Sequence, residues 1–485
     1  MMINLAGFQT CDVRGVYGSR ADAPISPLHA YLLGRSLAQV VPADQSVLIA
    51  GDGRDSTKVL LAALQTGLAR ACLNLGTEVP TPLAYFAKQQ RKAHALAIVT
   101  ASHHPAPFNG IKIQVGDLPA QPELITCLRA HVKKEFQKGA RPPDPLPLPL
   151  PDVSICRQLW NQYRDSLAEL CPELPNMSIV VDCMHGCYSD YAREALEAAN
   201  FHVHTLRDET KGNFNSIRPD PSEDKNLSDL QSAVTQKKAR LGVGLDGDGD
   251  RARFVDENGH LVDNGTMLVL FASYLLETNE SMDRTTVVYD QKTRRAVVHA
   301  LRAAGSTPVR EKSGHTFLRS RMLTENALLG GENSGHFFWG GRNIGPVDAG
   351  DCGLLAIFVV ARMLAHYQCS LSQLASRVPA SPFYTGDIRG LYFPHDRTEL
   401  LDNLATKASR RGYQVDSTDG VRIESPRAFV QLRASVTEPD LLTAVLDADD
   451  WHSLSGISAV LLDLLPDKAA EIGVHIQQRV EALRT

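Results

Sequence analysis

The sequence predicts an α/β protein of three related α/β domains followed by a C-terminal α+β domain. Three observations support this prediction. The chain has 485 residues, which is enough for three or four domains of ordinary size. A unit of apolar strand, polar turn, amphipathic helix and second strand occurs three times. After about residue 378 this unit does not recur, so the last part of the chain is predicted to form a domain of another kind.

The three repeated units begin with short runs of apolar and β-branched residues, which are typical of parallel strands covered on both faces. The units span residues 46–79, 178–203 and 285–309. Gly76, Asn200 and Gly305 each occupy a place where a helix C-terminus is expected. We therefore predict domains over residues 1–155, 156–262, 263–378 and 379–485.

Residues 141–151, RPPDPLPLPLP, separate the first two domains. Proline alternates with leucine over most of this stretch, which excludes a helix and favours an extended connector. A ligand for a proline-recognition module is the alternative interpretation.

Composition and charge exclude several classes of protein. Apolar residues make up 43% and charged residues 22% of the chain, and the net charge is −5. This balance gives no reason to expect nucleic acid or an anionic membrane as a partner. No run approaches the roughly 18 apolar residues of a membrane span, and the N-terminal residues do not resemble a secretory signal. The nine cysteines are scattered without zinc-site spacing, so we expect a reduced, cytoplasmic enzyme.

The strongest chemical signal is LGVGLDGDGDRARFVDENG, residues 241–259. Its alternating aspartates are Asp246, Asp248 and Asp250. Three carboxylates at this spacing can converge on one hard divalent cation, and the glycines allow a tight backbone turn. A solvated acidic turn is one alternative. An EF-hand is another, since Glu257 stands at loop position 12, but Arg251 stands where that loop requires glycine. We predict a strand–loop–strand Mg²⁺ site.

The second signal is a strand that runs into Thr-Ala-Ser-His-His-Pro, residues 100–105, with Lys112 a few residues beyond. Ser102 stands at the end of this strand, where α/β proteins place their ligands. A hydroxyl there needs a base or a metal to become reactive. A capped turn with unrelated histidines is the alternative. The segment lacks the G-x-S-x-G elbow, so a hydrolase triad is not indicated.

The third signal is LLGGENSGHFF, residues 328–338. It places Glu332, Asn333, Ser334 and His336 on a glycine-flanked loop between apolar runs. Such a loop can direct several polar groups at one ligand, and a plain polar turn is the alternative.

The fourth signal is FVQLRASVTEPD, residues 429–440, where a strand reaches Arg433 and then Ser435 and Thr437. We expect a helix to begin after Thr437. An arginine fork, two hydroxyls and the free N–H groups of a helix start would bind a phosphate. Helix capping alone explains the threonine but not the arginine.

Two weaker signals are more typical of structure than of function when each is taken alone. Residues 8–15 place Arg14 in an early glycine-adjacent turn. Residues 312–316 include Gly314 and His315 directly after the third repeat, and this segment can contact a sugar hydroxyl or a phosphate.

Taken together, these segments resemble the α-D-phosphohexomutase superfamily, the phosphomannomutases and phosphoglucomutases. The motifs occur in the family's order from Arg14 to Thr437, across essentially the whole chain. The resemblance implies four domains around a central cleft, each contributing one loop. The chain departs from the family pattern at His104, where Asn is usual, and at Val436, where Asn or Gly is common.

The resemblance also implies a role for each loop. Ser102 would carry the transferable phosphoryl group and would bind Mg²⁺ together with Asp246, Asp248 and Asp250. The other catalytic residues would be Arg14, Lys112, Arg251 and His336. The substrate would be bound by Gly314, His315, Glu332 and Ser334, and its non-reacting phosphate by Arg433, Ser435 and Thr437.

The implied reaction interconverts hexose 1-phosphate and hexose 6-phosphate, with mannose, glucose or both as the sugar. It would proceed through a phosphoserine and a hexose 1,6-bisphosphate, which is also the activator. A phosphoglucosamine mutase and a Mg²⁺-dependent sugar phosphatase are the alternatives. The expected partner is a sugar phosphate, and the oligomeric state stays open.

Overall fold

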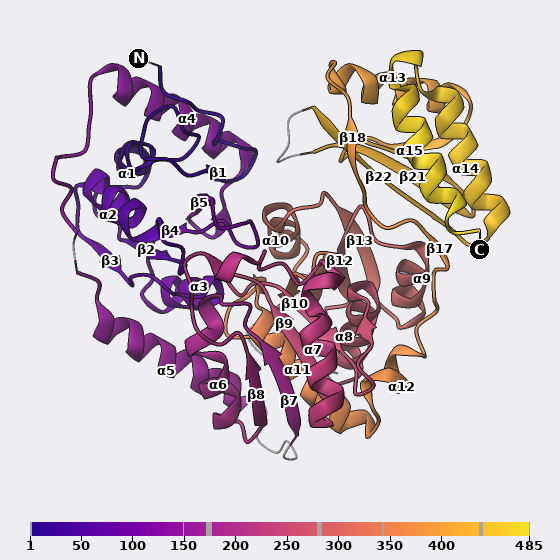
Figure 1. The fold of residues 1–485 in the computed structure, drawn as a ribbon, viewed down its shortest axis with the longest axis horizontal. Helices are drawn as coiled ribbons and strands as arrows, with labels where there is room; N and C mark the ends of the chain where they lie inside the picture. Colours follow the sequence, from indigo (N-terminus) through magenta and orange to yellow (C-terminus); the bar gives the residue numbers. More distant parts are fainter. Residues whose placement is uncertain are drawn as a thin grey trace.

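A computed structural model describes residues 2–148, 150–170, 177–278, 284–341, 344–435 and 440–484. Within these ranges the chain forms four β-sheets in succession, each accompanied by helices (Figure 1). The first three sheets contain neighbouring parallel strands, whereas every pairing in the fourth is antiparallel. The predicted fold class, three α/β domains and a C-terminal α+β domain, is confirmed.

The first sheet has the strand order β1-β5-β4-β2-β3, with β6 paired to β5. Its strands are β1 (Val13–Val16), β2 (Val47–Gly51), β3 (Cys72–Asn74), β4 (Ala95–Val99), β5 (Phe108–Val115) and β6 (Leu118–Pro119). The helices of this part are α1 (Pro27–Val40), α2 (Thr57–Leu68), α3 (Thr81–Gln90) and α4 (Pro122–Gln137). Parallel strands β2 and β4 are buried along their whole length, as expected of strands with both faces covered.

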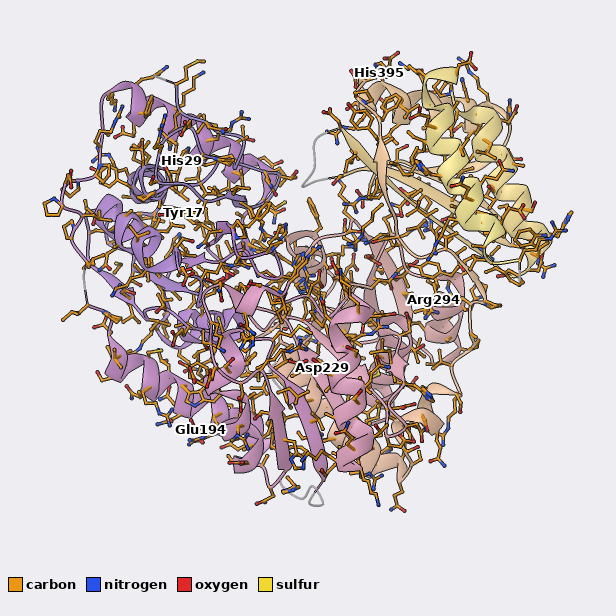
Figure 2. The ribbon with its side chains drawn as sticks, viewed as in Figure 1. Tyr17, His29, Glu194, Asp229, Arg294 and His395 are labelled. Carbon is orange, nitrogen blue, oxygen red and sulfur yellow. The ribbon has the colours of Figure 1, made fainter. Side chains whose placement is uncertain are left out.

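The second sheet has the order β11-β10-β9-β7-β8. Its strands are β7 (Ser178–Asp182), β8 (His202–Leu206), β9 (Leu241–Leu245), β10 (Ala252–Val255) and β11 (Leu261–Val262). The helices of this part are α5 (Val153–Glu169), α6 (Ala192–Ala198) and α7 (Ser228–Lys237). Glu194 accepts hydrogen bonds from Arg157 and Arg164, which ties α6 to α5 on the outside of the molecule (Figure 2). Helix α5 also includes residue 155, the position predicted as the first domain boundary.

The third sheet has the order β13-β12-β14-β15-β16. Its strands are β12 (Thr286–Asp290), β13 (Thr307–Glu311), β14 (Leu329–Gly331), β15 (Phe337–Trp339) and β16 (Gly350–Asp351). The helices of this part are α8 (Asn264–Thr278), α9 (Arg295–Ala303), α10 (His315–Thr324), α11 (Gly353–Tyr367) and α12 (Leu371–Ala375). The strand–helix–strand unit predicted over residues 285–309 is present as β12, α9 and β13.

The fourth sheet has the order β17-β22-β21-β20-β19, with β18 paired to β22. Its strands are β17 (Phe383–Tyr384), β18 (Ile388–Tyr392), β19 (Gln414–Asp416), β20 (Val421–Ser425), β21 (Ala428–Ala434) and β22 (Leu441–Ala448). The helices of this part are α13 (Arg397–Arg410), α14 (Trp451–Leu464) and α15 (Ala470–Glu481). Helices α14 and α15 lie side by side against the sheet (Figure 1).

The helix predicted to begin after Thr437 is wrong. Residues 441–448 form strand β22, which pairs antiparallel with β21 from Leu442–Ala434 to Ala448–Ala428. The Thr-Glu-Pro sequence resembles a helix start, but the apolar residues that follow it bury their side chains in the sheet. The loop near Arg433 is therefore a connection between two strands.

Of the three residues predicted to end helices, two do so and one does not. Asn200 and Gly305 follow α6 and α9 with φ of +63° and +86°, the left-handed conformation that ends many helices. Gly76 does not end a helix. Helix α2 stops at Leu68, Ala69 takes the left-handed conformation, and the predicted helical segment then continues as strand β3.

Apolar burial joins the first three sheets into one body. A single cluster of buried side chains includes Leu83 of α3, Val181 of β7 and Phe358 of α11. The fourth domain has a separate apolar core between its sheet and its helices. Polar contacts connect it to the third domain, among them the ion pair between Lys292 and Asp387 at 3.0 Å. In the part of the chain that the structure describes, no helix combines the length and apolar character needed to cross a membrane.

Candidate active site

Ser102 lies just beyond the end of β4, on a loop with a strained backbone. Its φ is +50°, a left-handed conformation that is uncommon for a residue with a side chain. Thr100 Oγ1 accepts its N–H at 2.9 Å, and its own Oγ donates to Asp246 Oδ2 at 2.7 Å. The residue is only 2% exposed. The loop therefore directs the Ser102 hydroxyl at the second domain.

Buried Arg54 holds the Ser102 loop in shape. Its guanidinium pairs with Asp52 at 2.9 Å and donates to four backbone carbonyl oxygens at 2.7–2.9 Å. These carbonyls belong to Ser102, His104, Pro105 and Phe108. No sequence motif indicates this role of Arg54, because the acceptors lie 48 to 54 residues further along the chain.

The acidic loop connects antiparallel strands β9 and β10, as the predicted strand–loop–strand site requires. Its three aspartates, Asp246, Asp248 and Asp250, are all fully buried. Gly247 has no room for a side chain, since a Cβ there would lie 2.7 Å from the backbone oxygen of Ser102. Glycine at this position lets the acidic loop and the serine loop come into direct contact.

The acidic loop has the donor set of a cation site. One carboxylate oxygen from each aspartate lies within 4.8 Å of the others. Burial, followed by the charges of Asp250 and Asp248, raises the pKa of Asp246 well above its usual value. Among the described residues, Asp248 Oδ1 and Asp250 Oδ1 are buried without a hydrogen-bond partner. Clustered, buried and partly unpaired carboxylates fit a hard divalent ion.

Lys112 lies between two of these aspartates. From β5, its ammonium donates to Asp248 Oδ2 at 2.7 Å and to Asp250 Oδ2 at 2.5 Å. Burial alone would lower the pKa of Lys112, but the two carboxylates raise it well above its usual value. Burial likewise opposes ionisation of Asp250, whose pKa the charges of Lys112, His336 and Arg251 nevertheless lower. Lys112 is therefore protonated and partly balances the acidic loop.

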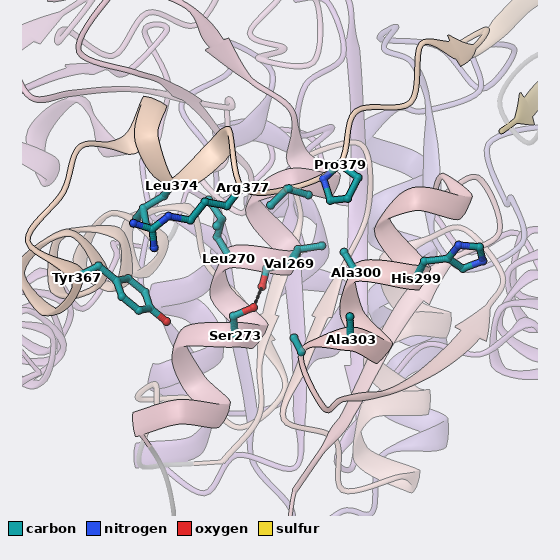
Figure 3. Close-up of a pocket in the computed structure, with 12 residues that line it drawn as sticks. Val269, Leu270, Ser273, His299, Ala300, Ala303, Tyr367, Leu374, Arg377 and Pro379 are labelled. Carbon is teal, nitrogen blue, oxygen red and sulfur yellow. Dashed lines mark hydrogen bonds between the residues drawn. The ribbon is translucent and has the colours of Figure 1, made fainter. Parts of the chain in front are cut away.

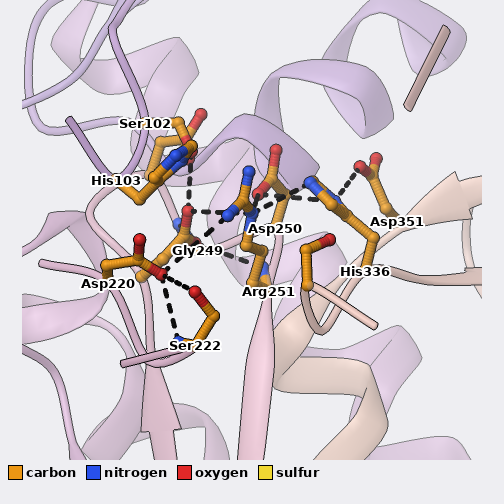
Figure 4. A network of polar contacts seen from close by, with 12 residues as sticks. Ser102, His103, Asp220, Ser222, Gly249, Asp250, Arg251, His336 and Asp351 are labelled. Carbon is orange, nitrogen blue, oxygen red and sulfur yellow. Dashed lines mark hydrogen bonds and ion pairs between the residues drawn. The ribbon is translucent and has the colours of Figure 1, made fainter. Parts of the chain in front are cut away.

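Arg251 and His336 join the second domain to the third (Figure 4). Arg251 Nε donates to His336 Nε2 at 2.9 Å, and Nδ1 of the same ring lies 2.8 Å from Asp351 Oδ2. Because Nε2 accepts a hydrogen bond, the ring proton in this arrangement is on Nδ1 and is donated to Asp351. Asp351 was missed in the sequence, since no motif spacing connects it to His336.

Several arginines create a positive environment beside Ser102. Arg14 Nη1 lies 3.3 Å from Nδ1 of His104, and Arg218 donates to the backbone oxygen of His103 at 3.3 Å. Burial, then the charges of Arg14 and Arg218, lower the pKa of His104 to about 2. Burial and nearby arginines also hold the pKa of His103 well below its usual value. Neutral histidines and charged arginines suit a group that becomes anionic at Ser102.

The loop between β14 and β15 contacts the segment before α10. Glu332 Oε1 accepts the N–H of Gly314 at 2.6 Å, and Glu332 Oε2 accepts the Ser334 hydroxyl at 2.8 Å. His315 begins α10, with its ring centre 6.4 Å from that of His336. Burial lowers the pKa of His315 to about 4. The four predicted sugar-contacting residues thus form one cluster next to His336.

The described residues of the fourth predicted loop, Arg433 and Ser435, belong to the C-terminal domain. Arg433 near the end of β21 donates through Nη1 to Asp419 Oδ2 at 2.7 Å, and Ser435 follows that strand. Thr437 lies outside the described residues. Asp419 was also missed in the sequence, because it precedes a different strand from Arg433.

A cavity of about 520 Å³ lies elsewhere, between α8, α9 and the segment after α12 (Figure 3). Val269, Leu270 and Ala300 contribute apolar walls, and Arg377 also lines the cavity. None of the predicted site residues lines it. This cavity takes no part in the site described above.

Comparison with protein families matches most of the chain. Residues 6–139, 161–259 and 263–381 match the models for phosphoglucomutase/phosphomannomutase alpha/beta/alpha domains I, II and III, respectively. These ranges contain the serine, acidic and sugar-loop motifs.

Individual relatives match over nearly their whole length. The chain is 30% identical to a phosphomannomutase/phosphoglucomutase of Pseudomonas aeruginosa over 463 residues, 94% of this chain and 95% of that protein. It is also 30% identical to a phosphoglucomutase of Neisseria meningitidis, over 94% and 96% of the two chains. A phosphoglucosamine mutase of Frankia alni has the same identity over 95% and 98%. Among solved structures, a phosphoglucomutase/phosphomannomutase family protein from Burkholderia thailandensis superposes with a TM-score of 0.81 at 26% identity, covering 97% and 98%.

Proposed function

The chain belongs to the phosphoglucomutase/phosphomannomutase family of phosphohexomutases, and from this premise we propose how its own residues carry out the reaction. The enzyme moves a phosphoryl group between O1 and O6 of a hexose through a phosphoserine at Ser102. The hexose is mannose, glucose or both. The single observation that carries this proposal is the 2.7 Å contact between Ser102 Oγ and Asp246 Oδ2. It places a hydroxyl from one domain at the acidic loop of another.

Ser102 and the three aspartates of the acidic loop would hold a Mg²⁺ ion, which supplies positive charge next to the phosphoryl group. A phosphoserine carries about −1.5 to −2 charges near neutral pH, so buried carboxylates at this distance would otherwise repel it. The unpaired oxygens of Asp248 and Asp250 support this assignment. The metal's identity as Mg²⁺ rests on the all-oxygen donor set.

The surrounding cations would stabilise the phosphoryl group as it transfers. The charges of Arg14 and Arg251 both act on His103, next to Ser102, and these arginines would donate to the phosphoryl oxygens, where charge accumulates in phosphoryl transfer. Lys112 and His336 would move protons to and from the sugar hydroxyls. His336 suits this role, since its Nδ1 proton is donated to Asp351 and its unprotonated Nε2, which accepts a hydrogen bond from Arg251, is the nitrogen that can take up a proton.

The remaining loops would bind the two ends of the substrate. Gly314, His315, Glu332 and Ser334 would contact sugar hydroxyls, and Arg433, Ser435 and Thr437 would bind the phosphate that is not reacting. A hexose 1,6-bisphosphate would form as the intermediate and would reorient in the site, so that its other phosphate faces Ser102. The same compound would phosphorylate Ser102 and so activate the enzyme. A few hydrogen bonds to the sugar are compatible with both orientations.

We also propose a cytoplasmic location. The eight cysteines that the structure describes are free thiols, which suits a reducing compartment.

The test is a coupled assay on mannose 1-phosphate, glucose 1-phosphate and glucosamine 1-phosphate, with Mg²⁺ and a trace of hexose 1,6-bisphosphate. Formation of the 6-phosphate of mannose or glucose is the expected result. A preference for glucosamine 1-phosphate would instead favour the phosphoglucosamine mutase alternative, to which the Frankia relative points. Stoichiometric release of inorganic phosphate would indicate the sugar phosphatase.

A further inference from the structure

One oxygen atom of Asp419 connects the fourth domain to the third. Oδ2 of Asp419 accepts a hydrogen bond from Arg433 Nη1 at 2.7 Å and another from the backbone N–H of Ser313 at 3.3 Å. The next residue, Gly314, donates to Glu332 in the sugar loop. Asp419 thus contacts both the arginine assigned to the substrate phosphate and the segment assigned to the sugar.

The backbone at Asp419 is held firmly against Arg433. The side-chain amide of buried Gln431 donates to the carbonyl oxygen of Asp419 at 2.9 Å. Gly420 has a φ of +78°, and a Cβ there would lie 2.3 Å from Leu432 O and 2.7 Å from Arg433 Cα. Only glycine permits this close approach. The Asp419 carboxylate therefore reaches Arg433 from a turn that packs closely against the strand carrying Arg433.

The ion pair between Arg433 and Asp419 is largely buried, which strengthens its effect on the orientation of Arg433. The side chains of Arg433 and Asp419 are 13% and 17% exposed, so solvent screens their attraction less than at an open surface. An arginine side chain has many rotamers. A hydrogen bond from one Nη to a carboxylate restricts the orientation of the guanidinium plane. A neighbouring cation, Lys292, is held in the same way by Asp387 at 3.0 Å. Two cations of this region, Arg433 and Lys292, thus each have a carboxylate partner.

Building on the function proposed above, we propose that Asp419 is a positioning residue for substrate phosphate. It holds the Arg433 guanidinium in its phosphate-binding orientation and couples that loop to the sugar loop through Ser313. A carboxylate that merely occupied the anion's place would have to leave when phosphate binds. The hydrogen bond from Gln431 and the close packing at Gly420 instead fix the backbone that carries the Asp419 carboxylate next to Arg433.

The test compares Asp419→Ala, Asp419→Asn, Arg433→Ala and the double variant Asp419→Ala/Arg433→Ala by steady-state kinetics with glucose 1-phosphate at saturating Mg²⁺. Asp419→Ala should raise KM about tenfold with kcat within about threefold of wild type, as expected for a misplaced binding group. Asp419→Asn keeps an oxygen acceptor and should recover part of the loss. The double variant should match Arg433→Ala, because Asp419 acts through that arginine.

Asp463→Ala is the matched control, since Asp463 pairs with Arg411 on the exposed face of the same domain. It should leave KM unchanged. Calorimetric titration with glucose 6-phosphate in the presence of EDTA measures binding, because the chelator stops turnover of this substrate, and it should show the same order of affinities. An unchanged KM, tighter binding in Asp419→Ala, or additive losses in the double variant would overturn the proposal. Failure of the proposed function would be seen separately, as absence of mutase activity in the wild-type protein.

Discussion

Arg251 and His336 form a direct side-chain hydrogen bond between the second and third domains, with 2.9 Å between Arg251 Nε and His336 Nε2. The other ring nitrogen of His336 lies 2.8 Å from Asp351. This chain of three residues runs from Arg251 of the acidic loop through His336 of the sugar loop to Asp351 of β16. It orients both side chains that we assign to the reacting end of the substrate.

Asp351→Asn should lower kcat about 10- to 100-fold and change KM much less. The asparagine can donate its amide N–H to Nδ1 of His336, which favours the tautomer with the ring proton on Nε2. In that tautomer Nε2 cannot accept a proton from the substrate. The measurement is steady-state kinetics with glucose 1-phosphate, with circular dichroism to verify folding. A kcat equal to that of wild type would exclude Asp351 from orienting His336.

Asp248→Asn should raise the Mg²⁺ concentration for half-maximal activity at least about tenfold, since it removes one charged ligand. Chelation by EDTA should abolish the wild-type activity, and added Mg²⁺ should restore it. Asp224→Asn provides the control, because Asp224 is an exposed acidic residue of the same domain. Activity that is indifferent to EDTA would rule out the acidic loop as a required metal site.

Arg433→Ala should weaken substrate binding roughly 10- to 150-fold, the value of a charge-assisted fork to phosphate. Some loss of kcat should accompany it, since the remote phosphate helps to orient the reacting end. Arg433→Lys keeps the charge without the fork and should fall between wild type and alanine. Neither variant should alter the Mg²⁺ requirement. An unaltered kcat/KM in Arg433→Ala would leave this loop without its assigned role.

Asp447→Asn should change the pH dependence of stability at the junction of the third and fourth domains. Asp447 accepts the backbone N–H of Arg295 at 2.6 Å, and burial raises the pKa of Asp447 from 3.8 to about 6. The folded state therefore binds more protons than the unfolded state between these values, and the contribution of Asp447 to stability falls as pH rises through them. Asparagine keeps the acceptor and does not titrate.

The free energy of unfolding in urea, measured near pH 5 and near pH 8, checks this prediction. The free energy of unfolding of Asp447→Asn, taken relative to that of wild type, should rise by roughly 1–3 kcal/mol between the lower and the higher pH. An equal difference between the two proteins at both pH values would show that Asp447 is ionised throughout the range.

The sequence predicted the parts of the site that depend on local pattern. Ser102 at the end of a strand and the aspartates between two strands follow from short motifs, and both have the predicted settings. Arg54, Asp351 and Asp419 could not be predicted in this way, because each acts on residues brought near only by the folded chain.

The two wrong predictions in the fold have a common cause. A local signal for helix starts or ends, at Thr437 and at Gly76, competed with strand pairing that only the whole sheet determines. The predicted boundaries at 155, 262 and 378 stay predictions, as do the roles of the site residues.

The phosphoserine at Ser102 is the central claim, and the mass of the intact protein tests it most directly. After incubation with glucose 1,6-bisphosphate and Mg²⁺, wild-type protein should gain one phosphoryl group, and peptide mapping should place it on Ser102. Ser102→Ala should gain none at that position and should lose turnover by orders of magnitude while keeping its fold. An active wild-type enzyme with no phosphoryl group on Ser102, or a fully active Ser102→Ala variant with bisphosphate present, would contradict the account.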